Sequence, residues 1–253
     1  GTAPIWRLSI DTWHLEVPFI KRPPSTNGAA WNSSASLTQA GTFALGLVLV
    51  CTGWLVLVRR AERMEGSSRR RAKIVLAVCA LWAIPVLLGP PLLSNDSYSY
   101  AAQGEMTAQG LDPTAVGPAI GLGQGEFVQQ VDGFWRWAPA PYGPVWVLVG
   151  GGAVIAAGHD PALSVWAFRG VALFGVALSA IGLVSLARSH KVSVPVALAI
   201  GIGNPLVILH LLGGNHNDAL MMGFLVCGVA AAKRDKRWLA VALLTMATAI
   251  KLP

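Results

Sequence analysis

The sequence predicts an all-α protein, a polytopic bundle of transmembrane helices with a long external loop that carries short surface helices. Of its 253 residues, 54% are hydrophobic and 12% are charged, whereas about a quarter of the residues of an ordinary soluble domain are charged. The mean hydropathy is +0.56, and the apolar residues gather in runs of bilayer-crossing length, about 20 residues for a helix. This composition argues against a soluble globular protein, a disordered chain and a disulfide scaffold.

The net charge of +7 is distributed as in a membrane protein. Seven cations and two acids lie between Arg59 and Lys73, whereas five acids and one arginine lie between Ser94 and Tyr142. Alternation of basic and acidic blocks across an apolar run is what the positive-inside rule produces, with the basic block in the cytoplasm. We therefore expect membrane lipids as partners and no nucleic acid.

The spans are predicted from the apolar runs and the basic blocks between them. Residues 145–157 are an apolar run of only 13 residues, too short for an ordinary crossing, and we expect a partial or oblique helix there. Pro85 is expected to kink the second span. The full crossings are predicted over residues 37–58, 74–93, 162–187, 192–214, 215–232 and 238–253.

With this topology the loop 94–143, the turn 213–218 and the N-terminal segment 1–36 all lie on the outer face. The chain begins at Gly1 rather than at a methionine and stops at Pro253 inside an apolar run. We therefore expect residues 1–253 to be part of one transmembrane domain that is truncated at both ends.

Asp96 lies where the second predicted span leaves the lipid. One interpretation is that Asn95 or Asp96 caps a short surface helix from about Ser97 to Gln109. The alternative is a catalytic base at the lipid–water boundary, where a lipid-borne substrate and a water-borne one can meet. A cap does not exclude catalysis, because it fixes the position of the carboxylate. The remaining acids of the loop, Glu105, Asp112, Glu126 and Asp132, are expected to be solvated.

Trp135, Arg136 and Trp137 lead back toward the membrane, followed by Tyr142. They fit an interfacial aromatic belt with an arginine that reaches the headgroups. They fit equally well a sugar site, in which the aromatic faces stack on a sugar ring and the guanidinium binds a phosphate.

The outer turn crowds four polar residues between apolar helices, namely Asn215, His216, Asn217 and Asp218. Such a group is unfavourable beside lipid unless it is exposed or binds something. A simpler possibility is that Asn215, Asn217 or Asp218 caps the following helix.

Arg169 and Lys251 are the only arginine and lysine within the spans, where a central charge costs roughly 2.5–3.5 kcal/mol on insertion scales. Ion relays place several such groups near the midplane, so we expect a site at the membrane surface instead. Lys251 either reaches the outer interface or pairs with a lipid phosphate. The cysteines are not spaced for a metal site.

Five motifs in order carry a resemblance to a known family. They are DSYSYAAQG (96–104), GLDP (110–113), APAPYGP (138–144), NPLVILHLLGGNHNDALM (204–221) and AIKLP (249–253). Together they resemble the actinobacterial α-(1→6)-mannosyltransferases that depend on polyprenol-phosphate-mannose. These enzymes belong to the GT-C superfamily of integral-membrane glycosyltransferases.

The resemblance implies a multi-pass enzyme of the plasma membrane whose site faces the exterior or periplasm. It would transfer mannose from polyprenyl-phosphate-mannose to a lipid-linked α-(1→6)-mannan, for lipomannan and lipoarabinomannan synthesis. An acid in the first external loop is commonly the base in that superfamily, and Asp96 matches it. Because this chain has Asn95-Asp96-Ser97 and no Asp-x-Asp pair, no metal cofactor is expected. The substrate-binding residues predicted are Tyr98, Gln103, Trp135, Arg136, Trp137, Tyr142, Asn215, His216, Asn217, Asp218 and Lys251.

The mechanism that the resemblance implies is a single in-line displacement with inversion, from a β-linked donor to an α-linked product. Asp96 would accept the proton of the acceptor 6-hydroxyl. The polyprenyl phosphate leaving group would be stabilised by a cation, either Lys251 or Arg136, with His216 a weaker candidate.

Two other classes of function remain open. A secondary transporter would use the outer polar groups as a gate, and it predicts inverted repeats and broken helices at the midplane. Asn204-Pro205 supplies one such break. A non-catalytic membrane scaffold would leave the polar groups around Asp96 and His216 without a role.

Overall fold

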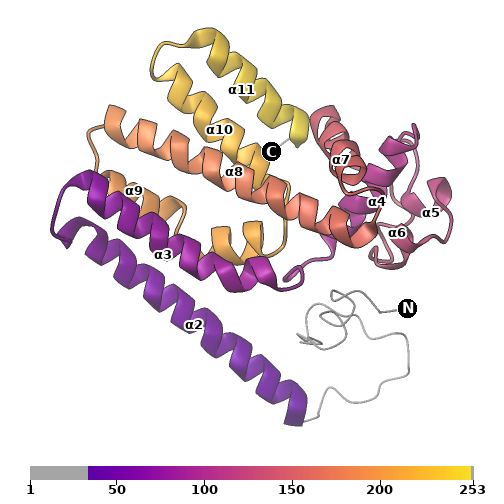
Figure 1. The fold of residues 1–253 in the computed structure, drawn as a ribbon, viewed down its shortest axis with the longest axis horizontal. Helices are drawn as coiled ribbons and strands as arrows, with labels where there is room; N and C mark the ends of the chain where they lie inside the picture. The colour runs from indigo at the N-terminus through magenta and orange to yellow at the C-terminus, as the bar shows by residue number, and fades with distance from the viewer. Residues whose placement is uncertain (1–33, 252–253) are drawn as a thin grey trace.

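Two long apolar helices open the described part of the chain, which is residues 34–251 of a computed structural model, with side chains described from residue 41 (Figure 1). α2 (Ser34–Arg63) and α3 (Ser68–Leu88) are joined by a short basic turn. Ser67 caps α3, because its hydroxyl accepts a hydrogen bond of 3.3 Å from the backbone N–H of Arg70. The turn lies where the sequence predicts the boundary between the first two spans.

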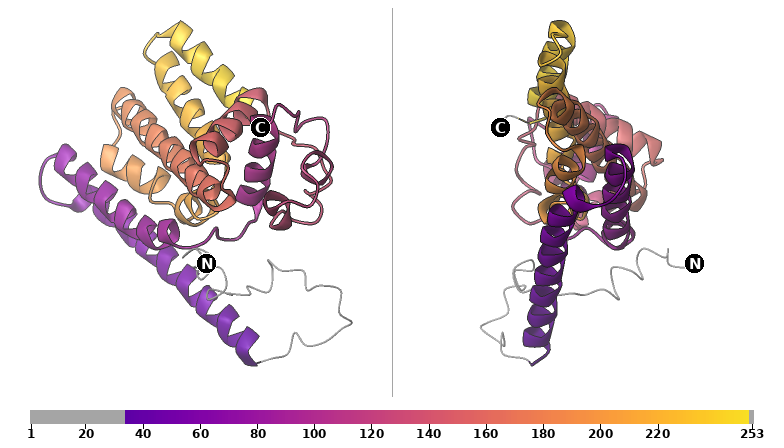
Figure 2. Two further views of the ribbon diagram at one scale, coloured as in Figure 1. Left: turned by 45° about the vertical axis from the view of Figure 1, so that its right-hand side comes forward. Right: turned by 90° about the vertical axis from the view of Figure 1, so that its left-hand side faces the viewer.

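The remaining long helices lie side by side in a flat assembly, which Figure 2 shows edge-on in its right-hand view. In Figure 1, α10 lies between α8 and α11, and α9 lies between α3 and α8. The helix bounds are α8 (Pro161–Ser189), α9 (Val194–Gly201), η1 (Leu206–Leu212), α10 (Asp218–Ala232) and α11 (Arg237–Ile250).

Three of the described helices are long and apolar enough to cross a membrane, over Gly41–Arg63, Ser68–Leu88 and Pro161–Ser189. The predicted span 192–214 is instead a pair, α9 and η1, bent by 48° at a short break. Asn204-Pro205 lies in that break, as expected of a proline that cannot continue the hydrogen-bond ladder. The prediction of an all-α transmembrane bundle is confirmed.

The two ends of the helices differ in character. At one end, which we call the basic end, lie the turns around residues 59–73, 188–191 and 233–237 (Figure 1). Arg188 and Arg234 of this end line one hollow. At the opposite end, which we call the site end, α3, η1 and α11 finish and α8 and α10 begin.

α4 (Asp96–Ala108) and α7 (Pro144–Ala156) pack against each other at the site end. α7 has 13 residues, fewer than a crossing needs. α4 differs from the predicted surface helix, since nine of its residues are buried. The reason is the close approach at Gly104, where a Cβ atom would collide with the carbonyl group of Gly150.

Aromatic rings extend this contact into a core at the site end. The Tyr100 ring meets Trp146 edge-on at 4.9 Å between centroids and lies 5.8 Å from Phe168 of α8. The loop between α4 and α7 contains the short helices α5 (Pro118–Gly121) and α6 (Glu126–Gln129).

The predicted end of the second span also differs from the observed end of α3. α3 ends at Leu88 rather than at residue 93, and an irregular segment connects it to α4. Most of the predicted outer N-terminal segment, residues 1–33, and the last two residues of the final span lie outside the described residues.

Substituting Gly104→Ala should separate α4 from α7 and destabilise the protein. Overpacking of this kind costs about 1–3 kcal/mol, so we expect a lower thermal unfolding temperature in detergent. The control is Gly152→Ala on α7, where no described atom lies within 4 Å of the added Cβ. Equal effects of the two substitutions would contradict the packing described.

Candidate active site

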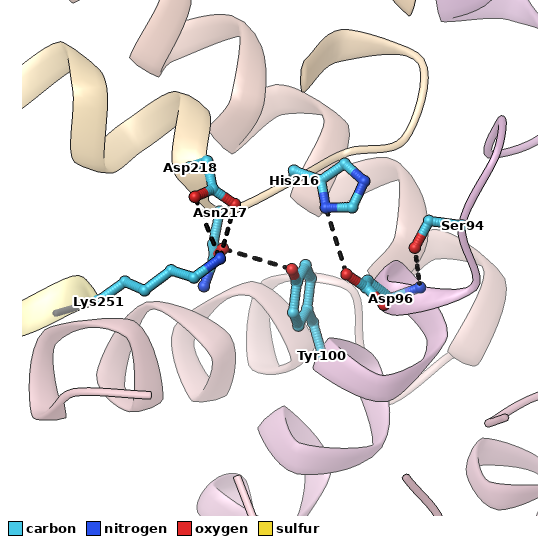
Figure 3. A network of polar contacts seen from close by, with 7 residues as sticks. All are labelled: Ser94, Asp96, Tyr100, His216, Asn217, Asp218 and Lys251. Atoms are coloured by element: carbon cyan, nitrogen blue, oxygen red, sulfur yellow. Dashed lines mark hydrogen bonds and ion pairs between the residues drawn. The ribbon is translucent and has the colours of Figure 1, made fainter. Parts of the chain in front are cut away.

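The candidate site is built where α4 begins beside the turn between η1 and α10 (Figure 3). Asp96 is the first residue of α4, and its Oδ2 lies 3.2 Å from Nδ1 of His216. The Ser94 hydroxyl accepts a hydrogen bond of 3.0 Å from the backbone N–H of Asp96. The His216 side chain is 7% exposed and that of Asp96 is 32% exposed. One carboxylate oxygen is therefore held by the histidine, while the acid as a whole stays accessible.

His216 holds the carboxylate in its ionised form. Burial opposes ionisation of Asp96, but the hydrogen bond and charge of His216, together with Ser94 and the charge of Lys251, lower its pKa below the ordinary value. Since Nδ1 of His216 faces the carboxylate, it carries the hydrogen. The other ring nitrogen, Nε2, is buried and has no partner among the described residues. The His210 ring stacks on His216 with 4.0 Å between centroids.

A second ion pair lies beside the first. Lys251, at the end of α11, binds both carboxylate oxygens of Asp218 at 2.9 and 3.1 Å. Asp218 is the first residue of α10, so the pair joins the start of one helix to the end of the next. The sequence allowed two interpretations of Lys251, a residue that reaches the outer interface or one that pairs with a lipid phosphate. It did not indicate Asp218 as the partner.

The hydroxyl of Tyr100 and the side-chain amide of Asn217 lie between the two ion pairs (Figure 3). The Tyr100 hydroxyl donates to Oδ1 of Asn217 at 3.4 Å, and the Tyr142 ring stands edge-on to Tyr100 at 5.5 Å between centroids. Burial raises the pKa of Tyr142 to about 12, and the charges of Asp96 and Asp218 act in the same direction. Tyr142 is therefore a neutral hydroxyl close to two carboxylates.

Other predicted site residues lie at the edge of this group or outside it. Tyr98 is partly buried on α4, and burial raises its pKa. Gln103 is buried, and its Oε1 has no partner among the described residues. Arg136 donates to the carbonyls of Val131 at 2.8 Å and Gln129 at 2.6 Å, so it is bound within its own loop.

The two loop tryptophans are not brought to Asp96 by any contact among the described residues. Trp137 is 59% exposed, and Trp135 meets Phe134 edge-on at 5.0 Å between centroids. This placement leaves both of their interpretations, interfacial belt and sugar platform, as predictions.

Helix capping does not account for the polar residues of the site. Asn95 and Asn217 occupy the N-cap positions of α4 and α10, yet neither side chain forms a capping hydrogen bond within the described chain. The side chains of Asp96 and Asp218 point instead to His216 and Lys251.

Sequence reasoning missed several neighbours of the site. Glu105 is buried rather than solvated, with Oε2 2.7 Å from Nδ1 of His159. Arg169 is buried beside the turn and donates to Oδ1 of Asn215 at 3.1 Å. The signal that could have found Arg169 was its isolation, as a charged residue within an apolar span.

No group of three or more histidine, cysteine, aspartate or glutamate side chains suited to a metal ion occurs among the residues that the structure describes. Chemistry without a metal therefore stays a prediction, founded on the Asn95-Asp96-Ser97 motif.

The comparisons with known proteins give the family. The sequence model of the N-terminal domain of the alpha-(1->6)-mannopyranosyltransferases matches residues 16–253. The chain belongs to this mannopyranosyltransferase family. A probable alpha-(1->6)-mannopyranosyltransferase of Mycolicibacterium smegmatis is 40% identical over 202 residues, which cover 79% of this chain and 35% of that protein.

Two other relatives have similar coverage. Alpha-(1->6)-mannopyranosyltransferase A of Mycobacterium tuberculosis is 34% identical over 81% of this chain and 39% of its own length. Alpha-(1->6)-mannopyranosyltransferase B of Corynebacterium glutamicum is 35% identical over 74% of this chain and 33% of its own length. The chain thus spans between a third and two fifths of these three mannopyranosyltransferases. No solved structure matches it.

The pH dependence of stability should reveal the Asp96–His216 pair. Because the pKa of Asp96 is lowered in the folded state, its stabilising contribution is present above the ordinary pKa and is lost as the pH falls through the lowered value. We expect the stability difference between wild type and Asp96→Asn to shrink over that acidic range. Thermal unfolding against pH measures this difference.

The matched comparison repeats the series in a His216→Leu background. There the folded-state pKa of Asp96 should lie closer to the ordinary value of aspartate, so the pH dependence of the Asp96→Asn effect should become smaller. An unchanged dependence would show that His216 does not hold the carboxylate.

Proposed function

We propose that the protein is an integral-membrane glycosyltransferase that moves mannose from polyprenyl-phosphate-mannose to a lipid-linked α-(1→6)-mannan acceptor. The observation that carries the proposal is the Asp96 carboxylate at the site end, which His216 holds ionised on a side chain that is still 32% exposed. Membership of the mannopyranosyltransferase family supports the sugar and the linkage.

Asp96 acts as the general base in this proposal. As the acceptor 6-hydroxyl oxygen attacks the anomeric carbon of mannose, its proton passes to the carboxylate and the bond from that carbon to the phosphate oxygen breaks. The configuration inverts in this single displacement. The lowered pKa ensures that the base is ionised at neutral pH, and the His216 hydrogen bond fixes its direction.

The leaving group needs positive charge more than it needs a proton, because a polyprenyl phosphate departs as an anion. Lys251 supports this role, since its ammonium group lies at the site end and its side chain is 37% exposed in the pair with Asp218. Arg136 is less suited, because two loop carbonyls already occupy its guanidinium. The partly buried hydroxyl of Tyr142 can bind a sugar hydroxyl beside the ion pairs. Tyr100 is only 1% exposed and its hydroxyl already donates to Asn217, so it supports the site from within.

The orientation follows from the charge of the two ends. Basic turns lie on the cytoplasmic side of membrane proteins, so the basic end faces the cytoplasm and the site end faces the periplasm or cell exterior. A plasma-membrane enzyme with this orientation meets both lipid-linked substrates outside the cell, in the assembly of lipomannan and lipoarabinomannan.

A secondary transporter is the second candidate, favoured by the 48° bend between α9 and η1 and by a buried arginine in α8. A transporter moves the intact polyprenyl-phosphate-mannose or a free sugar and forms no new glycosidic bond. Measuring mannosyl transfer and substrate translocation in one vesicle preparation separates the two functions.

Substituting Asp96→Asn should lower mannosyl transfer by about 10²–10⁴-fold, the range that a general base contributes. The measurement is radiolabelled mannose transferred from polyprenyl-phosphate-mannose, using the complete protein in membranes and normalising to its folded amount. The control Asp112→Asn removes a carboxylate on the surface of the same loop, fully exposed, and should leave the rate within a few-fold of wild type. Undiminished transfer by the Asp96→Asn variant would rule out Asp96 as the general base.

Replacing Lys251→Met should reduce kcat by about 10²-fold, because the lost charge acts on the developing phosphate anion in the transition state. Lys251→Arg keeps the charge and should retain most of the rate. A change in KM alone, with kcat intact, would assign Lys251 to ground-state binding and contradict leaving-group stabilisation.

A further inference from the structure

Arg169 is a cation buried in α8, a helix long enough to cross the membrane. It is 3% exposed, and no described carboxylate forms an ion pair with it. A charge in such a place is unfavourable unless other groups replace its hydration. Its hydrogen bonds therefore indicate its role in the structure.

One side of the guanidinium binds the end of α3. Nη1 donates to the carbonyl oxygens of Leu87 and Gly89, the latter at 2.7 Å. The last carbonyls of a helix have no partner within the helix, and a cation near them is favoured by the helix dipole. Seven residues after Gly89 the same segment reaches Asp96.

The other side of the guanidinium binds the turn that carries His216. Nε donates to Oδ1 of Asn215 at 3.1 Å, and Nδ2 of Asn215 donates to the Val165 carbonyl at 3.4 Å. Asn215 has a φ of +55°, in the left-handed region that most side chains disfavour. Its side chain is therefore held at both ends while its backbone directs the next residue, His216.

A backbone hydrogen bond connects the same two segments directly, from the N–H of Leu92 to the carbonyl of Gly213 at 2.7 Å. The Trp166 ring lies beneath the guanidinium, 4.7 Å from Cζ to the ring centroid, and restricts its rotation. A planar fork of donors suits this arrangement, whereas an ammonium group has no fixed fork.

We propose that Arg169 is a positioning residue for the reaction, which holds the segment ending in Asp96 and the turn carrying His216 at the spacing that base catalysis needs. The proposal rests on the proposed function, because it assigns Asp96 as the base. Arg169 does not touch the reacting atoms. It acts by binding both segments through one guanidinium.

The alternative is that Arg169 only stabilises the fold, and the pH profile of transfer distinguishes the two. The groups that face Asp96 are His216, Lys251, Tyr100 and Tyr142, and His210 stacks on His216. Of these, His216 is the one directly next to Asn215, the side chain that Arg169 binds. Loss of positioning therefore weakens the Asp96–His216 contact and moves the acidic limb of kcat/KM to higher pH, whereas lower stability alone leaves the limb in place.

The experiment compares variants of the complete protein in membranes. Arg169→Gln should lower kcat/KM by about 10²-fold, the effect of misplacing a reacting group by about 1 Å, and should shift the acidic limb in the same direction as His216→Leu. The kcat/KM of Arg169→Lys should fall between the values of wild type and Arg169→Gln. In a His216→Leu background, Arg169→Gln should change the rate by less than about 3-fold, because the contact it positions is already gone.

Val176→Ala is the matched control, since it removes buried volume from the same helix away from the guanidinium and should lower thermal stability without moving the limb. If Arg169→Gln does not fold, Asn215→Gly keeps the left-handed backbone and removes the acceptor beside His216, and it should show the same shift. Full additivity of Arg169→Gln with His216→Leu, or an unmoved limb, would overturn the proposal.

A measurement independent of activity separates this inference from the base assignment. The ¹⁵N signal of His216, identified by its loss in His216→Leu, reports the hydrogen bond from Nδ1. If Arg169→Gln alters that signal while Asp96→Asn transfers mannose normally, positioning holds and the proposed base is wrong. If the signal is unaltered and Asp96→Asn is inactive, the base holds and the role of Arg169 is wrong.

Discussion

The structure depends on one contact between residues far apart in the chain, the 3.2 Å approach of Asp96 to His216. It brings the start of α4 against the turn between η1 and α10, which is where the proposed chemistry takes place. Partial burial alone would raise the pKa of Asp96 and disfavour its ionised form. The hydrogen bond and charge of His216 oppose this effect, while the acid stays accessible.

Packing around this contact explains how a helix as short as α4 can hold Asp96 in a fixed position. Gly104 allows the backbone of α7 to approach closely, and Tyr100 fills the space between α7 and α8. Groups fixed by packing on rigid elements hold their geometry better than groups on loops. The ion pair of Lys251 with Asp218 closes the same region from the side of α11.

The helical class and the polar cluster could be predicted from the sequence, because apolar runs, charge blocks and the motif around Asp96 are local signals. The burial of α4 could not, since it follows from a glycine contact between residues 46 positions apart. Nor could the partners of Lys251 and Glu105, because ion pairing across helices depends on their relative rotation. Arg169 was visible as an isolated cation, but its role needed the positions of the carbonyls at the end of α3.

The most direct measurement of the central claim is a structure of the complete protein with polyprenyl-phosphate-mannose or an unreactive analogue bound. The account predicts the mannose at the site end, with the face of the anomeric carbon opposite the phosphate open toward Asp96 and the phosphate near Lys251. A sugar bound at the basic end, or at the site end with Asp96 shielded from the position of an attacking hydroxyl, would contradict it.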